Sequence, residues 1–199
     1  VLGLRGVPAK KSGNAIAVEL IRYKIRPDES NDIFWLKGSD FHSRSIYGIQ
    51  YREYDEESKK VAEEYGIQRC RILRYPSDLR SLFRGKKDEG CCYLTLSFGD
   101  WLRMGGHILS FLLITRWDQE GWVRFQQTTF TAYTFFWQGI YSALGIKIMV
   151  TMQDIDREKL VKAQAIENIR GLSVMGHWSF FPMAFQDAEK CADVLITWG

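Results

Sequence analysis

The feature that most constrains the fold is an alternation of apolar, strand-like runs with helix-like segments over most of the chain. Apolar runs typical of strands occupy residues 1–4, 32–36, 69–74, 91–98, 147–152 and 193–198. Apolar spacing typical of helices occurs at residues 14–25, 55–65 and 77–83. Strands that alternate with helices favour a parallel sheet with helices on both faces. The sequence therefore predicts an α/β fold, a doubly wound, mostly parallel Rossmann-like sheet, with residues 1–199 as a single domain.

The opening of the chain predicts a strand, a glycine-rich turn and a helix. The turn contains Gly3, Gly6 and Gly13, and Asn14 is suited to cap the helix that we expect to follow. Glycines let a backbone approach a ligand closely, and a helix N-terminus offers N–H groups and a positive dipole end to an anion. With Arg5, which can bind a phosphate through two hydrogen bonds, these residues are candidates for binding a phosphorylated substrate. The alternatives are a tight strand-to-helix connection and a solvated arginine.

The composition excludes some classes of partner. The 27 basic residues are nearly balanced by 24 acidic ones, for a formal net charge of +3, so nucleic acid is not an expected partner. The four cysteines form no Cys-x-x-Cys pair and no histidine lies at ligand spacing, so we expect no metal site and no cofactor. This use of cysteine indicates a reducing compartment, and we expect a cytoplasmic protein without a signal peptide.

An uncharged stretch at residues 125–146 follows a largely apolar run at residues 105–115. The uncharged stretch has the length of a membrane span, about 20 residues, but glutamine, threonine and serine interrupt it. We therefore expect a buried or interfacial helix, with a membrane span as the alternative. Trp101 and Trp117 lie beside the apolar run, and tryptophan favours the membrane interface, so peripheral contact with the inner face of a membrane is also expected.

Candidate catalytic residues follow two of the expected strands. In residues 145–159 an apolar strand ends in Asp154 and Asp156, and ligands of open parallel sheets bind at the carboxyl ends of strands. Asp156 is suited to cap the next helix, which leaves Asp154 for chemistry. Asp100 follows the fourth expected strand and is a second catalytic candidate. His107, beside two glycines, is a candidate to line the substrate cleft, although a structural histidine is the alternative.

Three segments of the chain resemble bacterial family-four glycosyltransferases. Residues 3–9, Gly-Leu-Arg-Gly-Val-Pro-Ala, resemble the family's opening Gly-x-Arg-Gly-Ile-Pro-Ala, with Ser12 in place of the first glycine of a later pair. Residues 145–159 resemble a strand that ends in Thr-x-His-Gly-Leu-Asp-Trp before an Arg-Glu-Lys helix start, with Gln153 near the position of the histidine. Residues 188–196 resemble the family's next helix-to-strand step, Glu-x-x-Ala-x-x-Ala-Asp-x-Leu-Ile.

The resemblance implies a two-lobed GT-B glycosyltransferase, of which this chain would be the N-terminal lobe. That lobe mainly holds the acceptor, a glycan or a lipid-linked glycan, and a second lobe or a partner chain would hold the nucleotide-sugar. The glycine loop would cradle the departing diphosphate. Two other functions share the expected architecture. One is a nucleotide-binding Rossmann module that acts as an oxidoreductase or regulator, in which Asp40 would bind a ribose. The other is a membrane-associated assembly domain without catalysis.

Overall fold

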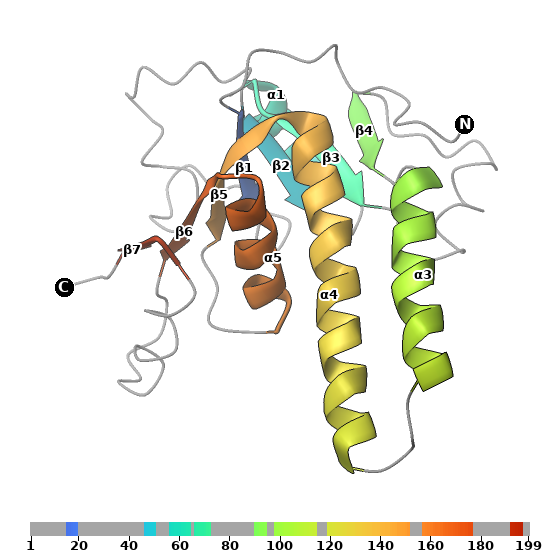
Figure 1. The fold of residues 1–199 in the computed structure, drawn as a ribbon. Helices are drawn as coiled ribbons and strands as arrows, with labels where there is room; N and C mark the ends of the chain where they lie inside the picture. The colour runs from blue at the N-terminus through green and yellow to red at the C-terminus, as the bar shows by residue number, and fades with distance from the viewer. Residues whose placement is uncertain are drawn as a thin grey trace.

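The chain forms a parallel sheet that is covered by helices. The computed structural model describes residues 15–19, 46–50, 56–64, 66–72, 90–94, 98–114, 119–151, 157–176 and 192–196. The strands are β1 Ala15–Glu19, β2 Ile46–Gln50, β3 Gln68–Ile72, β4 Cys91–Leu94, β5 Ile146–Thr151, β6 Leu172–Gly176 and β7 Val194–Ile196. The helices are α1 Glu56–Glu64, α3 Phe98–Ile114, α4 Gln119–Leu144 and α5 Arg157–Asn168. In the described ranges seven strands pair in the order β4-β3-β2-β1-β5-β6-β7 (Figure 1).

Every strand pair in this sheet is parallel, and helices cover both of its faces. On one face Ala62 of α1 packs with Ile16, Val18, Ile46, Ile67 and Val150. On the other face α4 and α5 cover a larger core, to which α4 contributes Trp137, Ile140, Tyr141 and Leu144. The prediction of an α/β fold with a parallel sheet between two layers of helices is confirmed.

The opening segment differs from the prediction. Residues 15–19 were expected to belong to a helix, but they form the central strand β1, which pairs with β2 on one side and with β5 on the other. Residues 15–18 are all buried, Ile16 and Val18 toward α1, Ala15 and Ala17 toward α4 and α5. A strand that is buried on both faces has a continuous apolar run rather than an alternating one, so its sequence also suits a helix.

Other expected elements are found, are shortened or lie outside the described residues. The expectations at residues 55–65, 69–74, 147–152 and 193–198 correspond to α1, β3, β5 and β7, and the uncharged stretch forms most of α4. The strand expected at residues 91–98 ends at Leu94, and α3 begins at Phe98. The short strands β2 and β6 were not expected. Expected elements at residues 1–4, 32–36 and 77–83 lie outside the described residues.

Helix α1 ends at a glycine. Gly66 has a φ of 66°, in the left-handed region, and its N–H donates to Glu63 O at 3.1 Å. The N–H of Ile67 donates to Ala62 O at 2.7 Å. This pair of bonds is a Schellman motif, which satisfies carbonyl groups at a helix end and requires a left-handed residue, usually glycine.

Helix α5 ends in the same motif without a glycine at the left-handed position. Arg170 has a φ of 56°, and its N–H donates to Glu167 O at 2.8 Å, while the N–H of Gly171 donates to Ile166 O at 2.9 Å. The left-handed conformation is unfavourable for a residue with a Cβ atom. The end of α5 therefore holds local backbone strain that the end of α1 avoids.

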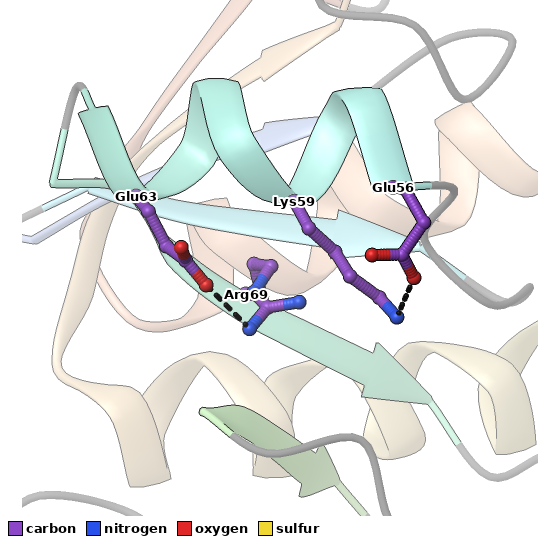
Figure 2. Close-up of polar contacts among 4 residues, drawn as sticks. All are labelled: Glu56, Lys59, Glu63 and Arg69. Atoms are coloured by element: carbon purple, nitrogen blue, oxygen red, sulfur yellow. Dashed lines mark hydrogen bonds and ion pairs between the residues drawn. The ribbon is translucent and has the colours of Figure 1, made fainter.

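Ion pairs stabilise α1 and connect it to β3 (Figure 2). Lys59 Nζ donates to Glu56 Oε1 at 2.8 Å within the helix, and this hydrogen bond lowers the pKa of Glu56. Arg69 projects from β3 beneath the helix, and its guanidinium lies 3.4 Å from Glu63 Oε1. The Arg69 side chain is only 5% exposed, so this contact satisfies a charge that is held between helix and sheet.

Candidate functional site

The strand order reverses between β1 and β5. Strands β1 to β4 follow one another outward toward one side of the sheet, and the chain then returns through α3 and α4 to place β5 on the other side of β1. Ligands of open α/β sheets bind in the crevice outside the carboxyl ends of the strands at such a reversal. The candidate site is therefore the edge beyond Glu19 of β1 and Thr151 of β5, which we call the carboxyl edge.

A small cavity lies between the sheet and α4 and α5 next to this reversal. Its volume is about 10 Å³, which is close to the space for one water molecule. The lining residues are Ala17, Val18, Ile49 and Met149 from the strands, with Trp137, Tyr141 and Lys162 from the helices. The Tyr141 hydroxyl donates to Met149 Sδ at 3.1 Å. The cavity is too small for a substrate, but one of its lining side chains is charged and lies close to the reversal of strand order.

That side chain, Lys162, is buried beside Glu158 and Trp137. Its side chain is 3% exposed, Nζ lies 2.9 Å from Glu158 Oε1, and the same atom lies 4.4 Å from the centre of the Trp137 ring. An ammonium group is stable in an interior only when it is paired in this way. Side chains on a helix lean toward its N-terminus, so the charge of Lys162 is directed along α5 toward Glu158 and the carboxyl edge.

Lys162 is not among the site residues expected from the sequence. A signal was present, because Glu158 and Lys162 are four residues apart in α5 and so can pair on one face of the helix. The same face also carries Val161 and Ala165, both buried, so a charge pair on it had to be partly enclosed. The contact with Trp137 could not be inferred from the sequence, because it arises from the packing of α4 on α5.

Most of the expected site residues lie outside the described residues, and their roles stay predictions. These are Gly3, Arg5, Gly6, Gly13, Asn14 and Asp154. The helix that was expected to present its N-terminus to a phosphate is strand β1, so that part of the phosphate-binding argument is wrong. The chain enters β1 at Ala15, which pairs with the first residue of β5, whereas β5 leaves the sheet at Thr151. The five residues of β1 span about 16 Å, so the start of β1 and the end of β5 lie at opposite edges of the sheet.

Asp100 and His107 both lie in α3. Asp100 is in the first turn of α3, which follows β4, and three strands separate β4 from β5, a distance of about 19 Å. The sheet therefore does not place the strand that precedes Asp100 beside the strand that precedes Asp154. The ring of His107 stacks on Phe135 of α4 with a centroid distance of 5.0 Å. His107 is thus part of the contact between two helices.

Helices α3 and α4 form an antiparallel pair that projects beyond the sheet (Figure 1). Phe111 and Phe125 pack between them, with ring centroids 5.7 Å apart. The exposed large apolar side chains of this hairpin are Leu102, Ile108, Leu109, Leu112, Leu113, Trp122, Val123, Phe125 and Tyr133, and the exposed charged side chains of Arg103, Glu120 and Arg124 lie among them in the sequence. No helix in the described part of the chain is long and apolar enough to cross a membrane. The hairpin therefore presents an apolar surface that the described residues leave uncovered.

The hairpin projects on the same side as the carboxyl edge. Helix α4 ends at Leu144 and leads through the tight turn at Gly145 into β5, so the two elements run in opposite directions. The 26 residues of α4 extend about 39 Å, whereas the six residues of β5 extend about 20 Å. The Gln119 end of α4 consequently lies well beyond the point at which β5 leaves the sheet.

A wider groove lies beside α5 near the start of β6 and β7. Its volume is about 300 Å³, within the range of small-molecule sites. Its polar residues are engaged with one another: Asp193 Oδ2 accepts hydrogen bonds from Ser173 N at 2.7 Å and Ser173 Oγ at 2.9 Å, and Gln164 donates to Glu167 at 3.1 Å. The bonds of Asp193 join the start of β7 to β6, and the bond of Gln164 lies within α5, so the polar residues of the groove have structural roles.

No metal site is found among the described residues, in which no three histidine, cysteine, aspartate or glutamate side chains come together. Comparison of the chain with protein-family models, with curated proteins and with solved structures gives no match. The case for a function therefore depends on the carboxyl edge, the hairpin and the three segments that resemble glycosyltransferases.

Proposed function

We propose that this chain is the acceptor-side lobe of a nucleotide-sugar-dependent glycosyltransferase, with its site at the carboxyl edge. The observation that carries the proposal is the reversal of strand order between β1 and β5. Asp154 follows the end of β5 by three residues, and β5 is one of the two strands at the reversal. In parallel sheets this is the position at which ligands bind.

Two of the three glycosyltransferase-like segments support the proposal through their secondary structure. Residues 145–159 form β5 and the start of α5, which agrees with the strand and helix start of the family segment. Residues 188–196 end in β7, which agrees with its final strand. The opening segment gives no such support, because residues 15–19 form a strand. The proposal therefore depends on the β5 side of the site.

The chemistry assigned to this edge is the transfer of a sugar to a hydroxyl group. The bond between the sugar and the diphosphate breaks, the acceptor oxygen forms a new bond to the sugar, and the acceptor hydroxyl loses its proton. Asp154 is the candidate base for that proton.

The test measures release of the nucleoside diphosphate from a panel of nucleotide-sugars by the full natural protein, with and without lipid-linked glycan acceptors. Acceptor-dependent release is expected, and Asp154→Asn should lower its rate by about 100-fold or more, because a positioned base contributes on this scale. Glu167→Gln is the matched control, since it removes an exposed carboxylate from α5 and should leave the rate unchanged. Absence of release with every nucleotide-sugar, or full activity of Asp154→Asn, would contradict the proposal.

The exposed surface of the hairpin favours a second function, attachment to a lipid surface. Leu113 is 77% exposed, Trp122 is 63% exposed, and both lie near the connection between α3 and α4. Large apolar patches on a protein surface mark sites of contact, and tryptophan and leucine on such a patch suit the headgroup boundary of a bilayer. Because the hairpin projects past the carboxyl edge, a bilayer that held it would present a lipid-linked acceptor on the side of the site.

Flotation with vesicles of phosphatidylethanolamine and phosphatidylglycerol tests the attachment. The chain should float with the vesicles, and Leu113→Gln and Trp122→Gln should each lower the partition coefficient about tenfold or more, since each removes apolar area from the contact. Leu172→Gln is the matched control, because Leu172 is 40% exposed on β6, away from the hairpin. Equal flotation of the hairpin variants and the control would exclude the hairpin as the attachment surface.

A further inference from the structure

We propose that Cys70 and Cys92 form a redox modification site, in which Cys92 reacts with a hydroperoxide and Cys70 then closes a disulfide with it. This inference is independent of the proposed transfer reaction. None of Cys70, Cys91 and Cys92 forms a disulfide in the structure.

The sheet register places the two cysteines opposite each other. Cys70 of β3 pairs directly with Cys92 of β4, and the next pair on the same face is Ile72 with Leu94. Neighbouring strands lie about 4.8 Å apart, which falls within the range of Cα separations, about 4.4–6.8 Å, that a disulfide spans. Since β4 is the last strand in the described sheet, it has a neighbour on one side only and can adjust its position as the bond forms.

The two thiols have different surroundings. Cys70 is fully buried in the core beneath α4, whereas Cys92 is half-buried beside it. A hydrogen bond from the Cys70 thiol stabilises the Cys92 thiolate and lowers the pKa of Cys92 to about 7. The same hydrogen bond, together with burial, raises the pKa of Cys70 well above its usual range. Cys92 is therefore the nucleophile, because the thiolate is the reactive form and only Cys92 combines it with access to solvent.

The reaction proceeds in two balanced steps. The Cys92 thiolate attacks the terminal oxygen of the hydroperoxide, an S–O bond forms as the O–O bond breaks, and the alkoxide that leaves takes a proton from water. Cys92 is oxidised by two electrons to a sulfenic acid, and the hydroperoxide is reduced to an alcohol. The Cys70 sulfur then attacks Cys92 Sγ, the S–O bond of Cys92 breaks, and the leaving hydroxide takes the proton of the Cys70 thiol and departs as water.

Cys91 provides an internal control. It precedes Cys92 in β4, and because side chains alternate along a strand it projects to the opposite face, where its register partner is Arg69. Cys91 Sγ contacts the backbone oxygen of Cys92 at 3.8 Å. Like Cys92 it is half-buried, but its partner in β3 is Arg69 and not a cysteine. A reaction that depends only on access would therefore modify Cys91 as readily as Cys92.

The test maps thiols on the full chain after treatment with a few equivalents of hydrogen peroxide. Reduced thiols are blocked with iodoacetamide, disulfides are then reduced and labelled with N-ethylmaleimide, and peptides are identified by mass spectrometry. We expect the second label on Cys70 and Cys92, iodoacetamide on Cys91, and a Cys70–Cys92 cross-linked peptide when the reduction step is omitted.

Variants separate the two steps. Cys92→Ser should abolish the reaction, Cys70→Ala should stop it at a sulfenic acid that dimedone traps on Cys92, and Cys91→Ser should react as the unmodified chain does. The mapping on the unmodified chain decides the matter even if a variant at the buried Cys70 fails to fold. A cross-link to Cys91 or Cys191 in place of this pair, or complete iodoacetamide labelling of Cys70 and Cys92 after peroxide, would overturn the proposal.

Discussion

Replacement of Arg170 by glycine should stabilise the chain. Arg170 has a φ of 56° at the end of α5, and a left-handed backbone costs a residue with a Cβ atom about 1–2 kcal/mol. Glycine removes this cost but gains freedom in the unfolded chain, which offsets about 0.4–1 kcal/mol. Arg170 is exposed, so little packing is lost. The net gain in the free energy of unfolding is about 0.5–1 kcal/mol, which corresponds to a rise of about 1–4 °C in the melting temperature for a chain of this length.

Thermal unfolding followed by far-ultraviolet circular dichroism measures this shift. Two variants control for its cause. Arg170→Ala removes the side chain and keeps the strained backbone, so its melting temperature should be unchanged. Gly66→Ala introduces the same strain at the end of α1, where φ is 66°, so it should lower the free energy of unfolding by about 1 kcal/mol. The reasoning from backbone strain is refuted if Arg170→Gly lowers the melting temperature or if Arg170→Ala raises it equally.

Three further predictions concern packing, thiol chemistry and charge. A Cβ atom on Gly171 would lie 2.7 Å from a backbone oxygen of β5. Gly171→Ala should therefore lower the free energy of unfolding, measured by urea titration, by about 1–3 kcal/mol. Gly105 on α3 has open space around it, so the control Gly105→Ala should raise the free energy of unfolding by about 0.5–1 kcal/mol. The rate of iodoacetamide reaction at Cys92 should rise with pH through a midpoint near 7, since hydrogen bonding lowers its pKa to about 7; a midpoint above 8.5 would contradict this. Glu158→Gln leaves the buried charge of Lys162 with a weaker partner, so it should lower the free energy of unfolding in the same titration by about 1–3 kcal/mol. The loss is moderate because Glu158 is 26% exposed.

The elements that the sequence predicted correctly are those with local signals. Gly66 is needed where α1 ends because of its left-handed backbone, and the apolar run of β5 is long enough to be recognised as a strand. The segment at Ala15 to Val18 was misassigned because alanine suits a helix, and only pairing with β2 and β5 on both sides makes it a strand. Long-range pairing of this kind leaves no periodic signal in a short buried strand.

The candidate site was predictable only in part for the same reason. The position of Asp154 after an apolar strand is a local signal, and β5 does end at Thr151. By contrast, the enclosure of Lys162 depends on Trp137, which is 25 residues earlier in the chain, and the pairing of Cys70 with Cys92 depends on the register of β3 and β4. Such contacts arise from tertiary packing, so spacing in the sequence did not indicate them.

The length of α4 has a consequence for the acceptors that the proposed transfer reaction could use. Its inner half is fixed against the core by Trp137 and Tyr141, while Trp122 lies near its outer end. If a bilayer held that outer end with the helix perpendicular to the membrane plane, Thr151 would lie roughly 20 Å above the lipid headgroups. A tilted helix would reduce this distance. Under the proposed function, short lipid-linked sugars would then reach the proposed site only when the helix is tilted, whereas longer glycans would reach it in both orientations.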